Sequence, residues 1–223
     1  MRILYFVLLV STWCAVAFAA DGKRAKCSLT PPVFTTAWLD MVDPCIKAMR
    51  NQVREELKAA ITYMAMAAHF AKDTVNRPGF SKFFFDAATE EREHAIAIIN
   101  YLLMRGELTT NIHKLINNSF VVQQNDWKDG ETALRAALEL EIHVTRKIRN
   151  IIEVCEQPPP NAKGDSYNDY HLVDYLTGEF LDEQLKGQRE IAGKISTLGK
   201  MVGKHGDLAE FLFDKKLLKG EVL

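Results

Sequence analysis

The sequence predicts an all-α protein, a bundle of four long helices followed by a short fifth helix. Apolar residues recur at the three- and four-residue spacing of a helix in four separate segments. No segment of any length shows the alternating pattern of a half-buried strand. Each of the four apolar stripes is also interrupted near its middle by a polar residue. The regular spacing indicates the fold, and the interruptions indicate where a site could lie.

The first two helices are expected to form a hairpin. The first should begin near Asp40 and Asp43, with Pro44 in its first turn, where a proline removes no helical hydrogen bond. The segment Asn-Arg-Pro-Gly at 76–79 ends the connection between them. The second helix is expected over 79–105.

A long polar segment, 106–126, separates the second helix from the third. Helix–helix connections in bundles usually have about 2–8 residues, so this length favours a crossover along the whole bundle. Such a crossover would make the second and third helices parallel. The third helix is expected to begin near 129–131, with Thr132 as a possible cap, and to end before the three prolines that start at Pro158.

The fourth helix is expected over 169–200, and Gly203 and Gly206 separate it from a short amphipathic helix over 208–218. This short helix should require a packing surface for its apolar residues. Those residues are Leu208, Phe211 and Leu212.

The polar interruption of the second helix is a carboxylate and an imidazole, Glu91 and His94, in line with Phe84, Ala87 and Ile98. An unpaired buried carboxylate costs several kcal/mol, roughly the stability of a whole domain. A metal ion would compensate for this charge, and Glu-x-x-His at i, i+3 places an oxygen and a nitrogen ligand side by side. The alternative is an exposed helical turn with a local ion pair.

The other three helices carry similar interruptions, which favours the metal site. Glu56 interrupts the first stripe, with Tyr63 about 10 Å further along the same face. Glu141 interrupts the third stripe, and Glu183 with Gln184 the fourth. Polar groups at matching depth in four helices are expected to converge.

Composition and the N-terminus restrict the class of protein. The formal net charge is −1, and no basic stripe, phosphate-binding glycine loop or Cys-x-x-Cys pair is present, so nucleic-acid binding is not expected. Arg2 followed by an apolar run and Ala-Phe-Ala at 17–19 predicts a secretory signal peptide over 1–19. A signal anchor is the alternative. With cleavage we expect a secreted protein with no membrane span, an N-terminal extension over 20–38 and one domain over 39–223.

The mature chain would keep three cysteines, an odd number in an oxidising compartment. The crossover topology brings Cys45, at the start of the first helix, to the same end of the bundle as Cys155, at the end of the third. We therefore predict an intrachain Cys45–Cys155 disulfide, which leaves Cys27 to bond another subunit. Asn117 begins an Asn-Asn-Ser sequon in the crossover that could carry a glycan.

Taken together, the sequence resembles the ferritins, in particular the heavy-type (ferroxidase) chains of secreted insect ferritins. The resemblance covers about residues 44–220 and rests on motifs such as Glu-Glu-Arg-Glu-His-Ala at 90–95 and Leu-Asp-Glu-Gln at 181–184. It implies iron storage, with Fe(II) oxidised by O2 at a di-iron centre, in a shell of 24 subunits that could include a light-type partner. The residues implied for the centre are Glu56, Tyr63, Glu91, His94, Glu141 and Gln184, all but Tyr63 as iron ligands.

Two other functions remain possible from the sequence. A light-type shell subunit without activity is disfavoured by the complete ligand set. Another di-iron bundle oxidase is disfavoured because a second Glu-x-x-His is missing: Val144 follows Glu141 and Lys186 follows Glu183 at the third position.

The chain departs from the ferritin pattern at two places. The expected nucleation cluster has Glu90 and Glu93, but its third position is Ile96. At the expected threefold iron-entry pore Asp174 is present, whereas Thr177 replaces the second acid. Fewer carboxylates in a pore would attract ferrous ions less strongly.

Overall fold

The computed structural model describes residues 40–108, 115–116, 120–122, 124, 126–157 and 168–221. Across these residues the regular structure is entirely helical, which confirms the predicted fold class. The helices are α2 (Asp43–Ala71), α3 (Pro78–Met104), α4 (Gly130–Glu156), α5 (Tyr170–Tyr175), the π-helical segment η2 (Leu176–Leu181), α6 (Asp182–His205) and α7 (Asp207–Leu218). The predicted signal peptide, Cys27 and the Asn117 sequon lie outside the described residues. Within the described ranges, no helix is sufficiently long and apolar to span a bilayer.

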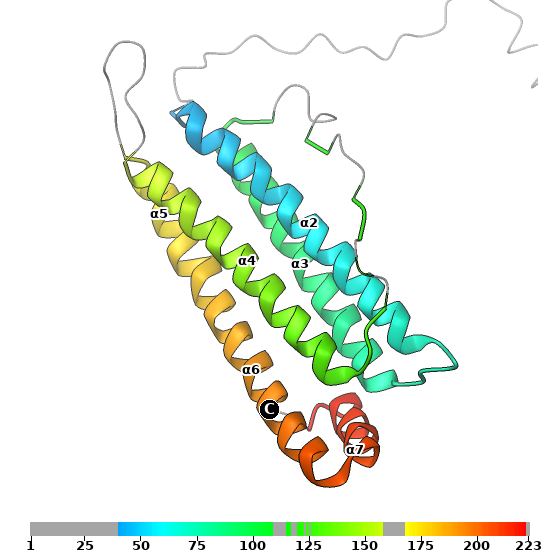
Figure 1. The fold of residues 1–223 in the computed structure, drawn as a ribbon. Helices are drawn as coiled ribbons and strands as arrows, with labels where there is room; N and C mark the ends of the chain where they lie inside the picture. Colours follow the sequence, from blue (N-terminus) through cyan, green and yellow to red (C-terminus); the bar gives the residue numbers. More distant parts are fainter. Residues whose placement is uncertain are drawn as a thin grey trace, which may run out of the picture. The chain divides into compact units, whose positions relative to one another are not determined.

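Helices α2 and α3 form an antiparallel hairpin, and α4 runs parallel to α3 (Figure 1). The start of α4 lies beside the start of α3, because Gly130 is so close to Phe80 that an added Cβ would lie 2.3 Å from its ring. At the other end Cys45 of α2 is disulfide-bonded to Cys155 of α4, with the two Cα atoms 5.5 Å apart. The crossover topology and the disulfide predicted from it are both confirmed.

Helix starts agree with the sequence signals except at α4. Pro44 and Pro78 occupy the first turns of α2 and α3. The cap of α4 is Asp129, whose carboxylate accepts a hydrogen bond from the Thr132 amide at 2.7 Å, so the prediction of Thr132 as the cap is wrong. An aspartate carboxylate is a stronger acceptor than a hydroxyl at a helix N-terminus.

The fourth long helix is continuous through α5, η2 and α6, and η2 is a wide π turn. Four buried residues follow one another at four-residue spacing: Leu172, Leu176, Phe180 and Gln184. In an α-helix each four-residue step drifts about 40° around the axis, so the last side chain would lie roughly 120° from the first. The wider turn of η2 takes up this drift and keeps the side chains facing the bundle. The helix also ends later than predicted, at His205, and Gly206 beyond it has φ +55°.

The apolar core has two halves. One half, which includes Met49, Ile98 and Ile148, surrounds the disulfide end, and the other, which includes Phe70, Phe84 and the Leu134 side chain, lies toward α7. The buried residues Glu56, Glu91, Glu141 and Gln184 lie between the two halves. The predicted stripes are largely buried, although Met64, expected in the first stripe, is 52% exposed.

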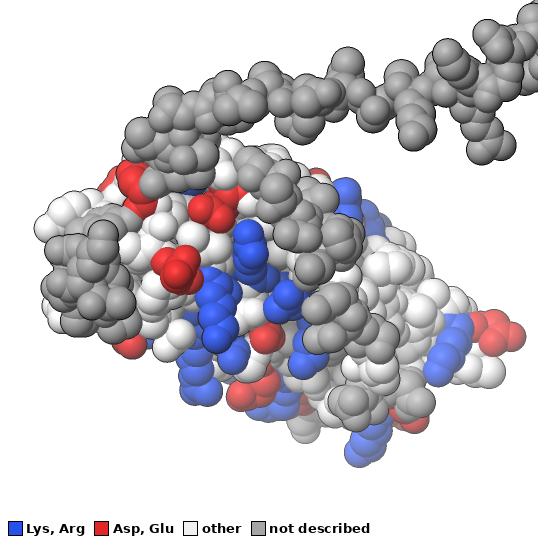
Figure 2. All heavy atoms as spheres, turned by 90° about the horizontal axis from the view of Figure 1, so that it is seen from above, with Lys and Arg blue, Asp and Glu red and all other residues white. Residues whose placement is uncertain are grey.

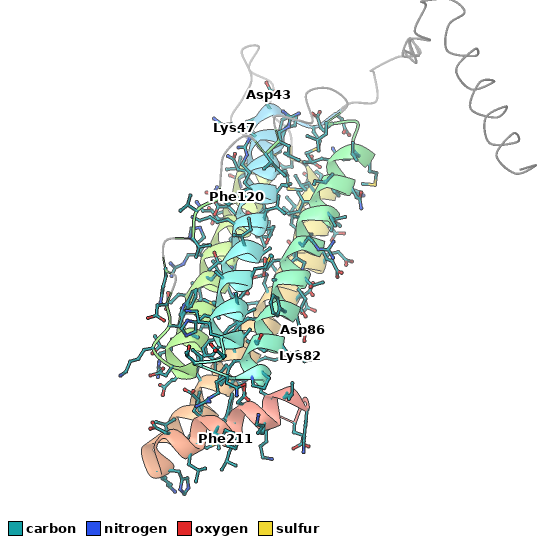
Figure 3. The ribbon with its side chains drawn as sticks, turned by 90° about the vertical axis from the view of Figure 1, so that its right-hand side faces the viewer. Asp43, Lys47, Lys82, Asp86, Phe120 and Phe211 are labelled. Atoms are coloured by element: carbon teal, nitrogen blue, oxygen red, sulfur yellow. A yellow bond between two sulfur atoms is a disulfide. The ribbon has the colours of Figure 1, made fainter. Side chains whose placement is uncertain are left out.

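Helix α7 crosses the ends of α3 and α4 (Figures 1 and 3). Leu208, Phe211 and Leu212 are about half exposed in the single chain, so the packing surface expected for them stays a prediction. Within this chain the helix packs through Ala209 and Phe213, and the Phe213 ring lies 5.7 Å from that of Phe80.

Two acids on α7 also cap the neighbouring helices. Asp214 is fully buried and accepts hydrogen bonds from the Gly79 and Phe80 amides at 2.7 and 3.0 Å. Glu210 accepts from the Gly130 amide at 2.9 Å and pairs with Arg77. These contacts place carboxylates at the positive ends of α3 and α4. Specific polar contacts, more than the apolar stripe, therefore orient α7.

Candidate metal centre

The polar layer between the two core halves contains three residues able to bind one metal ion. Glu56, Glu91 and His94 each offer one ligand atom, and these atoms lie within 4.8 Å of one another. One oxygen of each glutamate and Nδ1 of His94 are buried without a hydrogen-bond partner among the described residues. Buried polar atoms are normally paired, so three unpaired ones at the same point indicate a ligand that the protein chain does not supply.

The second part of the layer is formed by Glu141 and Tyr63. Glu141 is buried and accepts a short hydrogen bond from the Tyr63 hydroxyl. Besides burial, the nearby Glu141 carboxylate raises the pKa of Glu91, so Glu91 adjoins both groups of candidate ligands. This is the arrangement needed for one carboxylate to bridge two ions.

Gln184 and Glu183 both lie on the fourth helix but in different environments. Gln184 is buried and accepts a hydrogen bond from the Thr145 hydroxyl at 2.7 Å. Its oxygen is therefore turned toward Thr145, and binding a metal directly would require the amide group to rotate. Glu183 is largely exposed, yet its carboxylate lies 3.3 Å from Nε2 of His94.

Three residues that support the layer were not predicted from the sequence. Gln52 donates to Glu56 at 2.8 Å, and Gln188 donates to the Thr145 hydroxyl at 2.5 Å. Gln52 lies four residues before Glu56 and Thr145 lies four residues after Glu141, so each shares a face with a predicted ligand. Polar residues one turn from a predicted ligand were the signal that could have identified them.

The electrostatics of the layer favour bound cations. Burial raises the pKa of Glu91 to about 8, and the neighbouring Glu141 carboxylate adds to this effect. Burial and the nearby Glu91 also raise the pKa of Glu56 well above its ordinary value. Burial raises the pKa of Tyr63 in the same way, so its phenol stays protonated and able to donate to Glu141. A divalent ion would replace the protons that these carboxyls otherwise hold.

A groove of about 480 Å³ between α3 and α6 leads to this layer. Its walls carry the acids Asp86, Glu90, Glu183 and Glu190. Small cations therefore have an acidic route to the buried ligands. Lys82, which also lines the groove, pairs with Asp86 one turn away on α3 (Figure 3).

The remaining predicted iron-handling residues lie on exposed faces. Glu90, Glu93 and Ile96 are on the exposed side of α3, and Asp174 and Thr177 are exposed on α5 and η2. The weaker charge of the iron-entry pore stays a prediction. Basic side chains gather in the middle of the face seen from above, with acidic side chains among and around them (Figure 2).

The ligand set suits iron chemistry. Carboxylates with one imidazole match the preferences of Fe(II) and Fe(III), and two adjacent sites can deliver two electrons to one O2 molecule. Glu56, Glu91 and His94 form a richer set than Glu141 with Gln184. Such unequal sites suit ions that pass through the centre rather than a permanently held cluster.

Comparison with known proteins agrees with this geometry. A family model for the ferritin-like domain matches residues 46–201. A ferritin heavy chain of Drosophila melanogaster is 56% identical over 192 residues, which cover 86% of this chain and 90% of the relative. One from Papilio xuthus is 50% identical over 209 residues, covering 94% and 95%. The solved structure of Trichoplusia ni secreted ferritin, 50% identical, superposes with a TM-score of 0.80 over 87% of this chain and 98% of that chain. The chain belongs to the ferritin family.

Proposed function

We propose that this chain is a heavy-type ferritin subunit that oxidises Fe(II) with O2 at the buried polar layer and helps to store the ferric product. The observation that carries the proposal is the convergence of three unpaired ligand atoms, from Glu56, Glu91 and His94, in a site reached by an acidic groove. The heavy-chain names of its relatives support the same function.

In this proposal the two iron ions are substrates. The first binds to Glu56, Glu91 and His94, and the second to Glu91 and Glu141, with Gln184 as a weaker ligand or as a support for Glu141. Each Fe(II) gives one electron, so O2 is reduced to peroxide as two Fe(III) form. Tyr63 holds Glu141 in place through its hydroxyl.

The assembly and compartment follow from the family. A ferritin chain contributes to a multisubunit shell, and we propose a shell of 24 subunits that includes a light-type partner. The similarity to secreted ferritin and the predicted signal peptide support a secreted protein. Cys27, in the N-terminal extension, is proposed to bond another subunit.

A non-catalytic light-type subunit is the alternative. It would retain the bundle but have no use for unpaired buried ligands, which destabilise the folded chain unless ions bind them. We therefore favour the catalytic function.

The test is anaerobic loading of the assembled protein with Fe(II), followed by rapid mixing with O2 and optical detection of a transient di-ferric species. The double variant Glu56→Lys/His94→Gly should lose rapid oxidation but still assemble, because both residues lie inside one bundle. Gln184→Ala should be milder, because it affects only the weaker site. Oxidation by the double variant at the parent rate would exclude this centre.

A further inference from the structure

A row of aromatic rings leads from the metal centre through the half of the core that surrounds the disulfide, toward that end of the bundle. The His94 ring lies 5.7 Å from Phe180, and Phe180 lies 5.5 Å from Tyr175. Tyr175 stacks on Tyr101 with 4.5 Å between ring centroids. Phe180 and Tyr101 are both at least 95% buried. None of these rings except His94 has a part in the proposed oxidation of iron.

The π turn η2 positions Phe180, which lies in the middle of this row. Phe180 lies within η2, and the widened turn directs its side chain into the bundle against His94. π turns inside α-helices are rare and are found frequently at functional sites.

The far end of the row has the polar contacts of a redox-active phenol. Arg105 donates to the Tyr101 oxygen at 2.8 Å, so the Tyr101 hydrogen is free to point toward Nδ1 of His171, also 2.8 Å away. His171 belongs to the exposed surface. A phenol that loses an electron becomes a strong acid, and a hydrogen-bonded imidazole is a suitable acceptor for its proton. Burial raises the pKa of Tyr101 to about 12, so the reduced phenol keeps its proton at neutral pH.

We propose that Tyr101 and His171 form a redox-active pair that supplies single electrons to strong oxidants generated at the iron site, through Tyr175 and Phe180. The proposal rests on the proposed function, because iron oxidation produces the peroxide. Hydrogen peroxide that meets one Fe(II) ion gives Fe(III), hydroxide and a hydroxyl radical. One electron from Tyr101 with one proton then converts the hydroxyl radical to water, and the Tyr101 phenol becomes a neutral tyrosyl radical. Its own proton resides on His171, and the proton that water needs comes from solvent.

The position of the pair distinguishes it from Tyr63, which lies nearer to the ligands. Tyr63 is 99% buried and donates its hydrogen bond to Glu141 inside the centre. A radical on Tyr63 would therefore stay beside the iron ligands. A radical on Tyr101 lies next to an exposed residue, where a soluble thiol or ascorbate-type reductant can restore the phenol. The row thus removes oxidising equivalents from the buried site.

The test uses the assembled protein with Tyr63→Phe as background, so that Tyr63 cannot contribute a signal. Anaerobic Fe(II)-loaded protein is mixed with hydrogen peroxide, frozen rapidly and examined by electron paramagnetic resonance. We expect a tyrosyl radical that is lost when Tyr101→Phe is added. The matched control is Tyr170→Phe, since Tyr170 is 74% exposed, adjoins His171 in sequence and is outside the row. A signal that survives Tyr101→Phe, or that disappears with Tyr170→Phe, would overturn the assignment.

Two further variants test the path and the proton acceptor. Phe180→Leu keeps an apolar side chain but interrupts the row, and it should lose most of the radical yield. His171→Gln should shift the largest g-value of the remaining radical, because the Tyr101 oxygen loses a hydrogen-bond partner. An unchanged spectrum in both variants would exclude the pathway even if Tyr101 itself is oxidised.

The same preparations are also mixed with O2 and followed optically for iron oxidation. If the Tyr63→Phe protein oxidises iron at its di-iron centre yet gives no Tyr101 radical with peroxide, the relay alone is refuted. If the parent chain fails to oxidise iron with O2, the proposed function is refuted. The relay proposal then fails as well, because the centre produces no peroxide.

Discussion

The buried carboxylate of Asp214 provides a direct test of how α7 is held on the bundle. We expect Asp214→Ala to destabilise the protein strongly, because it removes the acceptor for the Gly79 and Phe80 amides at the start of α3. A hydrogen bond to a charged group contributes about 1.5–3 kcal/mol. Burial of the carboxylate, whose second oxygen has no hydrogen-bond partner, offsets part of this gain. A net loss of about 2–4 kcal/mol is consistent with these values and with the usual effect of losing a cap.

For a domain of this size, 1 kcal/mol corresponds to about 2–4 °C in Tm, so the apparent Tm should fall by roughly 5–15 °C. Circular dichroism at matched protein concentration would measure it. Asp214→Asn should show about half the effect, because an amide oxygen can still accept but the charge is gone. Asp207→Ala is the control, since Asp207 is an exposed acid on the same helix. An equal loss in both alanine variants, or none in Asp214→Ala, would refute the capping role.

Three more predictions concern the centre and the two ends of the bundle. First, the pKa of Glu91 is raised from 4.5 to about 8. Between these pH values the metal-free folded state keeps a proton that the unfolded state releases, so the free energy of unfolding should fall as the pH rises. Thermal unfolding of metal-free protein should show a steeper loss of stability from about pH 5 to pH 8 than Glu91→Gln does, and equal slopes would contradict the shifted pKa. Second, the Cys45→Ser/Cys155→Ser variant should lose up to about 5 kcal/mol, as measured by denaturant unfolding under non-reducing conditions, because the disulfide closes a loop of 110 residues. Third, truncation after Gly206 should weaken shell closure by uncovering the ends of α3 and α4; unchanged size-exclusion and heat stability would show that α7 is dispensable.

Periodicity and topology were sufficient to predict the arrangement of the long helices. A polar segment too long for a turn predicted the crossover, and the crossover predicted the Cys45–Cys155 pairing. The candidate ligands could be singled out because a charged residue inside an apolar stripe, such as Glu56 or Glu141, conflicts with local packing. The structure brings these residues together in the polar layer.

The features that were not predicted depend on contacts between distant segments. The packed face of α7 is selected by Glu210 and Asp214, which bind helix ends more than 75 residues away in sequence. The apolar residues Phe211 and Leu212 gave no indication of these polar contacts. The π turn left a sequence trace in the four-residue spacing that ends at Gln184. That spacing also fits an ordinary amphipathic α-helix, so it did not predict the wide turn.

The position of the polar layer explains why both ends of the bundle are reinforced. Three carboxyls with raised pKa values, on Glu56, Glu91 and Glu141, divide the core, and in the metal-free chain they reduce the stability gained from burial. The disulfide stabilises one end of the bundle, and the α7 caps stabilise the other. Neither contact involves a ligand, so both can hold the four helices in register while protons and metal ions exchange at the centre. The fold therefore keeps the candidate ligands poorly paired and retains their spacing, which is the condition that the proposed transient binding of two iron ions requires.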